Sequence, residues 1–185
     1  MNIAVYSGSF DPLHIGHLAI MEYLSKDKEV DWVYLVVSPK NPLKETIKAE
    51  SARDRFQAAV EAVRRYPKLH VWVDDIELNL PPPQYTIRTL DTLKLREPDN
   101  GFTLIMGADN LNGIRRWRCF ERILIEYGVA VYPRKGYDVE AIRNGLIQEN
   151  SEYKIRLLDA PIVDISSTQI REGLAAGKDM TEWLM

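Results

Sequence analysis

The stretch that decides the fold runs from Ile3 to Tyr23 and reads IAVYSGSFDPLHIGHLAIMEY. A short apolar run ends at Gly8, and an apolar run with helical spacing follows Gly16. This pattern predicts a strand, a glycine-containing turn and a helix. Gly8 lets the backbone adopt conformations that other residues avoid, and Gly16 bares the backbone near a helix start, where unpaired N–H groups favour phosphate. The turn therefore predicts a phosphate site.

His14 and His17 lie three residues apart in this turn, so a helical conformation would put both imidazoles on the same side. Imidazoles donate hydrogen bonds to phosphate oxygens and gain charge near neutral pH. The pair therefore suits a polyphosphate whose charge shifts during a reaction. The turn has neither the Gly-Lys-Ser/Thr of a Walker loop nor the G-x-G-x-x-G spacing of a dinucleotide fingerprint. Zinc ligation and simple capping of a helix start stay open as alternatives.

The whole-chain composition is typical of an ordinary globular protein. The 185 residues predict one domain, residues 1–185, with a sizeable core. A formal net charge of −3 argues against a general nucleic-acid-binding protein, whose affinity would depend on a basic surface. Cys119 is the only cysteine, which excludes an internal disulfide and fits a reducing compartment. With no secretion signal and no membrane-spanning apolar run, we expect a cytoplasmic protein that does not bind a membrane.

Apolar runs alternate with helical patterns along the rest of the chain. Strands are predicted at residues 3–6, 32–37, 69–73, 102–106, 129–132 and 155–158. Ser51 and Thr86 are predicted to cap the helices that follow the second and third strands. The alternation predicts an α/β fold with a doubly wound parallel sheet flanked by helices, and with its sites at the carboxyl ends of the strands.

A second candidate phosphate site lies in the stretch ISSTQIR, which opens the final long helix. Ser166, Ser167 and Thr168 place three hydroxyls at the predicted helix start. Arg171 lies about one turn further on, on the same side as Ser167. Hydroxyls, a helix N-terminus and a guanidinium can hold phosphate oxygens together. Ser166 with Gln169 also fits an ordinary capping box, and that alternative stays open.

Together the two motifs carry a family resemblance. The turn at residues 8–17 and the stretch at residues 165–171 resemble the nucleotidyltransferase superfamily with the H-x-G-H signature, which has a Rossmann-like fold. Further segments resemble the bacterial nicotinate-nucleotide adenylyltransferases: residues 41–44 (NPLK), 85–90 (YTIRTL), 105–110 (IMGADN) and Trp117. Two features depart from that family's pattern. Arg88 stands where relatives usually carry an acid, and relatives tend to continue through a further short helix beyond residues 179–185.

This resemblance implies adenylyl transfer from ATP to nicotinate mononucleotide, giving deamido-NAD and pyrophosphate, as a step of NAD biosynthesis. The attack on the α-phosphorus of ATP would be in line, with no covalent enzyme intermediate and no general base. Catalysis would then rest on positioning and charge stabilisation. Mg²⁺ is the implied cofactor, held mainly by substrate phosphates. The implied catalytic residues are His14, His17, Lys44 and Arg171.

Binding residues for the two substrates follow from the same resemblance. On the ATP side they are Gly8, Ser9, Phe10, His14, His17, Gly107, Asp109, Arg134, Ser166, Ser167, Thr168 and Arg171. On the nicotinate-nucleotide side they are Ser9, Lys44, Tyr85, Thr86 and Trp117. Tyr85 and Trp117 match the aromatic platform for the pyridine, and backbone N–H groups near Thr86 could select the nicotinate carboxylate. The C-terminal helices from about residue 166 would close the ATP site.

Plainer interpretations stay open for several of these residues. Lys44 could be a solvated loop lysine, Asp109 a helix cap and Arg134 half of a surface salt bridge. The spacing of Trp117 also fits a core stripe. Other functions remain as well: nicotinamide mononucleotide or phosphopantetheine as the acceptor, a nucleotide-binding regulator without turnover, or a metal-dependent hydrolase built on the two histidines.

Overall fold

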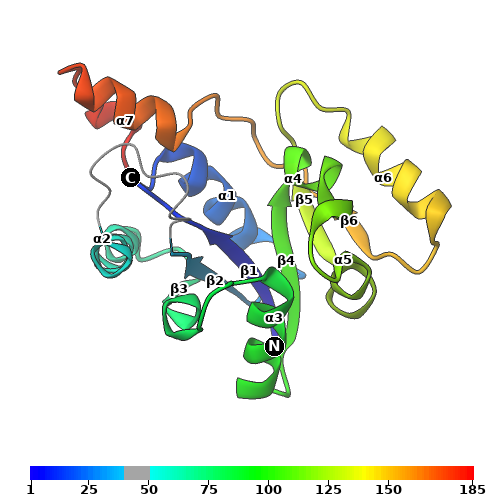
Figure 1. Ribbon diagram of the computed structural model, residues 1–185. Coiled ribbons are helices and arrows are strands. Elements are labelled where there is room, and N and C mark those ends of the chain that lie inside the picture. Colours follow the sequence, from blue (N-terminus) through cyan, green and yellow to red (C-terminus); the bar gives the residue numbers. More distant parts are fainter. Residues whose placement is uncertain (40–50) are drawn as a thin grey trace.

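Six parallel strands form one sheet in the order β3-β2-β1-β4-β5-β6 in this computed structural model, which describes residues 1–39 and 51–185 (Figure 1). The strands are β1 (Asn2–Gly8), β2 (Trp32–Val37), β3 (Val71–Asp74), β4 (Gly101–Gly107), β5 (Val129–Tyr132) and β6 (Ile155–Leu157). The chain builds outward from β1 to β3, crosses back, and builds outward again from β4 to β6. The predicted doubly wound parallel sheet is confirmed. The direction in which successive strands are added reverses between β1 and β4, which are parallel neighbours. A crevice therefore forms at the carboxyl ends of these two strands.

Helices connect the strands. The α-helices are α1 (Ile15–Lys26), α2 (Ala52–Arg64), α3 (Thr86–Arg96), α4 (Ala108–Asn112), α5 (Phe120–Arg122), α6 (Val139–Glu149) and α7 (Ser167–Ala175). The shorter turns are η2 (Ile76–Asn79), η3 (Ile114–Arg116), η5 (Thr181–Trp183) and a π-helical turn η4 (Ile123–Tyr127). The third strand begins two residues later than predicted, because the amide of Leu69 donates to the carbonyl of Tyr66 in the turn after α2.

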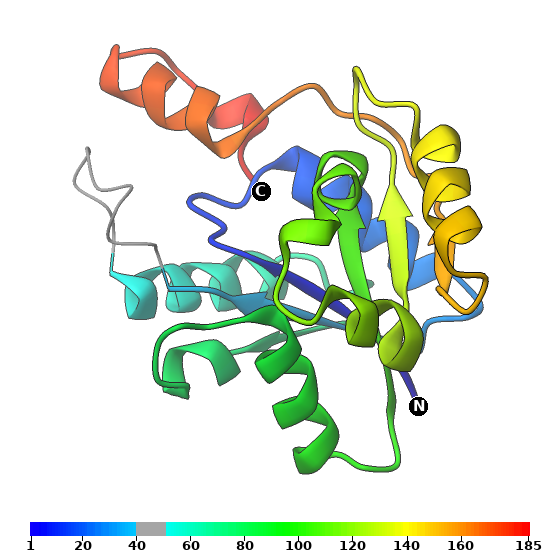
Figure 2. The ribbon, with the colours of Figure 1, turned by 45° about the vertical axis from the view of Figure 1, so that its right-hand side comes forward.

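Helices cover both faces of the sheet (Figures 1 and 2), and a hydrophobic cluster lies on each face. On one face α1 and α2 contribute Ile20, Met21, Leu24, Ala59 and Ala62. On the other face α3, α4, η4 and α6 contribute Leu90, Leu93, Leu111, Leu124 and Leu146. Burial of this apolar surface on both faces is the main favourable contribution to folding. It fixes the sheet between two helical layers, so the strand ends that form the crevice are held rigidly.

Helix caps follow the sequence at one predicted position and depart from it at another. The Ser51 hydroxyl accepts a hydrogen bond from the Asp54 amide at 3.1 Å, which confirms the predicted cap of α2. The prediction for Thr86 is wrong, because Tyr85 is the N-cap and Thr86 is already the first helical residue. Arg88, which stands where the family resemblance implies an acid, lies in the first turn of α3. Its guanidinium donates to the carbonyls of Pro81 and Pro83, both at 3.1 Å, and so ties the proline loop to α3.

The core argument gives a stability prediction for α3. Leu90 is fully buried, so Leu90→Ala removes apolar contacts and leaves a cavity, and should lower the unfolding free energy by about 2–5 kcal/mol. Leu95 lies in the same helix but is 83% exposed, so Leu95→Ala should change it by less than about 0.5 kcal/mol. Urea unfolding followed by circular dichroism measures both. Equal effects of the two substitutions would contradict this assignment of the core face.

Candidate active site

Two imidazoles close the start of α1. The Nδ1 atom of His14, the N-cap residue, accepts a hydrogen bond from the Gly16 amide at 3.0 Å. The Nδ1 atom of His17 accepts one from the His14 amide at 3.1 Å, so the two rings form a reciprocal capping box. The rings are stacked, with centroids 3.7 Å apart. Because each Nδ1 accepts from a backbone amide, a neutral imidazole here carries its proton on Nε2.

Both histidines are held neutral by their surroundings. Burial, and then the positive charge of Arg134, lower the pKa of His14 to about 4. For His17, burial, then the charge that His14 would carry, and then Arg134 hold the pKa well below its usual value. At neutral pH each ring is therefore an Nε2–H donor without a formal charge.

The packing of His14 explains a glycine. A Cβ at Gly16 would lie 2.8 Å from Cε1 and 2.9 Å from Nδ1 of His14, closer than real Cβ contacts come. The Gly16 amide is also already bonded to His14. Gly16 is thus required by the ring that covers it, and the sequence-based idea that its bare amide binds phosphate is replaced by this capping role.

Phe10 packs beneath the histidine pair. Its ring is 5% exposed and meets the ring of His17 edge-on, with centroids 5.1 Å apart. The backbone of Phe10 has φ 47°, in the left-handed region that residues with a side chain rarely adopt. The Phe10 ring also faces Tyr6 at 5.4 Å, so the turn after β1 is folded inward onto the core. Phe10 therefore supports His17 from below.

The second predicted motif docks onto the first. Ser166 and Gln169 form a full capping box at the start of α7, with bonds of 3.1 and 2.8 Å. The Ser167 hydroxyl donates to the carbonyl of Pro12 at 3.0 Å. The Arg171 guanidinium donates to the carbonyl of Asp11 at 2.6 Å and to the Thr168 hydroxyl at 3.2 Å. The capping alternative for Ser166 is therefore correct. The same helix start also contacts the turn that carries His14 through Pro12 and Asp11. Figures 1 and 2 show α7 lying beside the loop that leads into α1.

Asp109 and Arg134 bring the ends of β4 and β5 into the same region. The Nε of Arg134 donates to Oδ1 of Asp109 at 3.2 Å, with both side chains partly exposed. Asp109 is not the helix cap, since the N-cap of α4 is Gly107. A Cβ at Gly107 would lie 2.6 Å from Oδ1 of Asp109, so the glycine leaves room for this carboxylate. The salt-bridge alternative for Arg134 is correct, and its charge also reaches both histidines.

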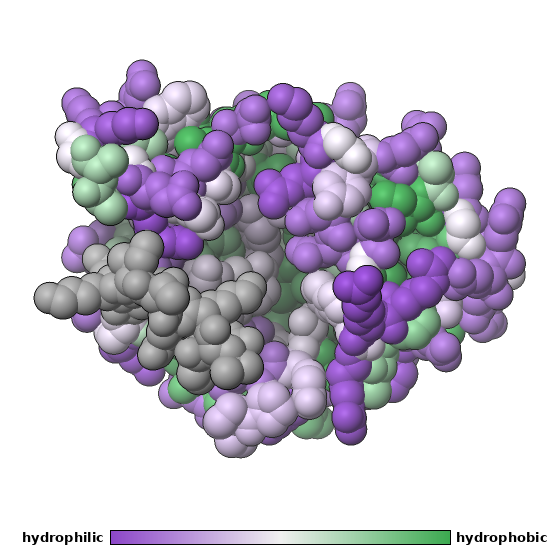
Figure 3. Space-filling view, turned by 45° about the horizontal axis from the view of Figure 1, so that its top comes forward, coloured by the Kyte–Doolittle hydropathy of each residue, from purple (hydrophilic) through white to green (hydrophobic). Residues whose placement is uncertain are grey.

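A cavity of about 430 Å³ lies over these groups. Six of the residues predicted for ATP line it: His14, His17, Asp109, Arg134, Ser166 and Ser167. The six other residues predicted for ATP do not line it: Gly8, Ser9, Phe10, Gly107, Thr168 and Arg171. Figure 3 looks toward this end of the molecule and shows a hollow between polar flanks. Two segments from opposite ends of the chain thus share one cavity.

Sequence reasoning missed several lining residues. They are Tyr6, Tyr132, Lys135, Tyr137, Gln169 and residues 161–165. Tyr132 ends β5 at the carboxyl edge of the sheet, so its position in the pattern could have revealed it. Residues 161–165 form no regular element, and only the path of the chain from β6 to α7 brings them over the cavity.

The described residues predicted for the second substrate, Ser9, Tyr85, Thr86 and Trp117, do not line this cavity. Tyr85 is 40% exposed at the start of α3, and the Arg118 guanidinium lies 5.4 Å from the centre of its ring. Trp117 is half-buried and packs against the core cluster below α3, so its core interpretation is correct for part of the ring. The carbonyl of Ser9 accepts from buried Arg55. Lys44, like the rest of residues 41–44, lies outside the described residues.

The metal-binding side chains of the cavity do not form a cluster. Across residues 1–39 and 51–185 no group of three or more His, Cys, Asp or Glu side chains is placed to hold a metal ion. The Nδ1 atoms of both histidines are occupied by amides, which removes one donor of each ring from metal ligation.

Among the helices of residues 1–39 and 51–185, none combines the length and the apolar character that a membrane span requires.

Known proteins resemble this chain along nearly its whole length. A family model described as cytidylyltransferase-like matches residues 5–173. A protein of Flavobacterium johnsoniae named "Probable nicotinate-nucleotide adenylyltransferase" is 39% identical over 180 residues, covering 97% of this chain and 90% of that protein. A protein of the same name from Bacteroides fragilis is 41% identical over 180 residues, covering 97% of this chain and 85% of its own.

A solved structure shares the fold. Plasmodium falciparum nicotinic acid mononucleotide adenylyltransferase complexed with NaAD superposes with a TM-score of 0.81 at 20% sequence identity, covering 99% of this chain and 90% of that one. The family resemblance drawn from the two motifs is confirmed by these matches. This chain therefore belongs to the cytidylyltransferase-like family and, within it, to the nicotinate-nucleotide adenylyltransferases.

Proposed function

We propose that this protein transfers the adenylyl group of ATP to nicotinate mononucleotide, giving deamido-NAD and pyrophosphate in NAD biosynthesis. The observation that carries the proposal is the single cavity that the histidine pair of α1 shares with the start of α7. Relatives that match nearly the whole chain bear the corresponding enzyme name. The Plasmodium falciparum structure holds NaAD, and a second one of the same enzyme is complexed with APC, which supports a site for a dinucleotide and a nucleotide analogue on this fold.

The reaction needs no nucleophile from the protein. A phosphate oxygen of the mononucleotide attacks the α-phosphorus of ATP, a new P–O bond forms, and the bond to the β-phosphate breaks to release pyrophosphate. The attacking phosphate is already anionic, so no general base is required. The protein's part is to align the two substrates and to stabilise the charge that moves onto the leaving group.

Neutral histidines suit the donor role proposed for them. With Nδ1 of His14 and His17 fixed by backbone amides, the Nε2–H groups are the only ring donors left for phosphate oxygens. Their orientation is set before substrate arrives, so little reorganisation accompanies the reaction. Lys135 and Arg134 line the same cavity, each beside an acidic partner, Asp164 and Asp109. Arg171 and Thr168, on the first turns of α7, would hold the outer phosphates, and Lys44 would neutralise charge near the attacking phosphate.

We propose Mg²⁺ as the cofactor, brought in by ATP. The donor set fits that arrangement, because the two carboxylates that line the cavity, Asp109 and Asp164, are each paired with a cation, Arg134 and Lys135. Magnesium that keeps phosphate and water ligands needs few protein groups. When bound, the ion neutralises phosphate charge.

We propose that the reaction takes place in the cytoplasm, where the exposed thiol of Cys119 would stay reduced.

An acceptor assay tests the function directly. Purified protein with ATP and Mg²⁺ should release pyrophosphate when nicotinate mononucleotide is the acceptor. Its kcat/KM should be at least about tenfold above that with nicotinamide mononucleotide, because the carboxamide leaves unpaired the polar groups that bind a carboxylate. Phosphopantetheine should give no turnover. A tenfold preference for nicotinamide mononucleotide, or turnover of phosphopantetheine alone, would replace the proposed acceptor.

His17→Ala should lower kcat/KM for ATP by about 10²- to 10³-fold, because it removes a preorganised donor to the developing charge. His70→Ala is the matched control, since His70 is exposed at the far edge of the sheet beside Trp32. Its rate should stay within about twofold of the wild-type rate. Circular dichroism of both variants checks folding, and a wild-type rate in His17→Ala would remove this residue from the mechanism.

The lowered pKa of His14 predicts how stability depends on pH. Below pH 6.5 the unfolded chain binds a proton at His14, but the folded protein does not until about pH 4, so acid favours unfolding in this window. Between pH 7 and pH 5 the wild-type unfolding free energy should therefore fall by about 1–2 kcal/mol more than that of His14→Gln. Urea titrations at the two pH values measure the difference. Parallel losses in both proteins would contradict a buried neutral His14.

A further inference from the structure

A buried carboxylate joins three segments of the chain beneath the crevice. Glu77, in η2, is 4% exposed and has no part in the phosphate chemistry derived above. Its Oε1 atom accepts from the Thr89 hydroxyl at 2.9 Å and from the Ser7 hydroxyl at 3.4 Å. We propose that Glu77 is a positioning residue for the acceptor nucleotide, because it holds α3 in a fixed place relative to the carboxyl ends of β1 and β2. This inference rests on the proposed function.

The hydroxyl partners of Glu77 belong to different elements. Ser7 lies one residue before the end of β1, and Thr89 lies near the start of α3. Ser38 follows β2 directly, and its hydroxyl is a third donor to Glu77. The hydroxyls of Ser7 and Ser38 are also within hydrogen-bonding distance of each other, at 3.0 Å. Glu77 therefore connects the strand ends beside the crevice with the helix whose start carries two of the residues predicted for the acceptor.

A buried cation holds the same strand ends from another side. Arg55, in α2, is 1% exposed, and its Nη1 donates to the carbonyl of Ser38 at 2.8 Å and to the carbonyl of Ser9 at 2.5 Å. Ser38 is thus held through its carbonyl by Arg55 and through its hydroxyl by Glu77. Ser9 is predicted to contact both substrates. The backbone that follows β1 and β2 is therefore fixed by side chains of both charges.

The hydroxyls around Glu77 suit a carboxylate in particular. Burial raises the pKa of Glu77, and hydrogen bonds from Ser38, Thr89 and Ser7 oppose that rise because they stabilise the ionised form. A carboxylate only accepts, so each of these hydroxyls turns its proton toward it. A carboxamide of the same size would offer one acceptor oxygen and turn an NH₂ donor toward hydroxyls that are already donating. Glu77→Gln therefore keeps the volume of the side chain but breaks the pattern of donors and acceptors.

The position of α3 matters to one substrate more than to the other. Among the residues that the structure describes, none from α3 lines the cavity assigned to ATP. A small shift of α3 would move the residues predicted for the acceptor and leave the histidine pair and the start of α7 in place. Loss of the Glu77 contacts should therefore weaken acceptor binding and leave ATP binding unchanged.

Steady-state kinetics separate positioning from stability. Glu77→Gln should raise KM for nicotinate mononucleotide about tenfold, which corresponds to about one hydrogen bond to a charged group. Both kcat and KM for ATP should stay within about twofold of the wild-type values. A residue that only stabilised the fold would lower the fraction of active protein, so its substitution would reduce kcat and leave both KM values unchanged.

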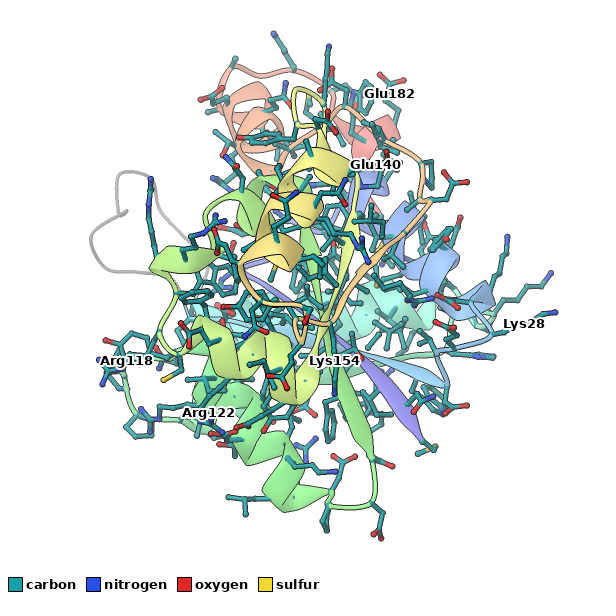
Figure 4. The ribbon with its side chains drawn as sticks, turned by 90° about the vertical axis from the view of Figure 1, so that its right-hand side faces the viewer. Lys28, Arg118, Arg122, Glu140, Lys154 and Glu182 are labelled. Atoms are coloured by element: carbon teal, nitrogen blue, oxygen red, sulfur yellow. The ribbon has the colours of Figure 1, made fainter. Side chains whose placement is uncertain are left out.

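Glu140→Gln is the matched control. Glu140 is an exposed carboxylate in the first turn of α6. Figure 4 shows it on the yellow helix α6, above the green helix α3 in that view. This variant makes the same chemical change away from the three joined segments, and it should behave as wild type. Circular dichroism of both Gln variants checks that they are folded.

Thr89 provides a second test that keeps Glu77 in place. Thr89→Val removes the hydroxyl with little change of shape and should raise the acceptor KM about three- to fivefold, whereas Thr89→Ser keeps the hydroxyl and should stay within about twofold. In a Glu77→Gln background, Thr89→Val should add less than about twofold, because the two residues share one hydrogen bond.

Two results would overturn the inference while the proposed function stands. One is an unchanged acceptor KM in Glu77→Gln or, if that variant does not fold, in Thr89→Val. The other is an equal rise of KM for ATP and for the acceptor. A wild-type protein that does not turn over nicotinate mononucleotide would overturn both the inference and the proposed function.

Discussion

The reciprocal bonding of two imidazoles to the first amides of α1 is the interaction on which the site depends. It satisfies backbone donors that any helix leaves unpaired, and by using Nδ1 of both His14 and His17 it fixes which nitrogen of each ring keeps a proton. It also forces Gly16, since nothing larger fits beside His14. A structural need, the helix cap, and a chemical need, two oriented donors, are met by the same two rings, through Nδ1 for the cap and Nε2 for the donors. A substitution of either histidine would therefore change both the helix cap and the ring donors.

The sheet gives this cap its setting. Because the strand order reverses between β1 and β4, the turn after β1 and the residues after β4 and β5 face one another across the carboxyl edge. Asp109 and Arg134 come from that second half, and Arg134 contributes to keeping both imidazoles neutral. Burial alone would lower the two pKa values, but the charge of Arg134 adds to the effect and also makes the cavity more attractive to an anion. Fold topology and electrostatics thus act in the same direction.

Much of the fold and part of the site could be predicted from the sequence because they depend on local pattern. The alternation of apolar runs gave the strands, and the spacing of His14 and His17 gave the shared face of their rings. Patterns failed where tertiary contacts decide. Thr86 has the chemistry of a cap, but Tyr85 is the N-cap of α3, and its carbonyl accepts from the amides of Arg88 and Thr89. Similarly, nothing in the spacing around Phe120 predicts that the helix there becomes a π-helical turn, or that residues 161–165 cross over the cavity.

The contacts between Ser167 and Pro12 and between Arg171 and Asp11 join residues 155 and 160 positions apart. The six strands pair with one another without either contact. The cavity, in contrast, needs the start of α7 beside the turn that carries His14. Closing so long a loop carries an entropic cost that grows only slowly with length, so the separation along the chain is a small obstacle to docking α7 on this turn. The ability to hold a nucleotide thus depends on a long-range contact that the sheet itself does not require.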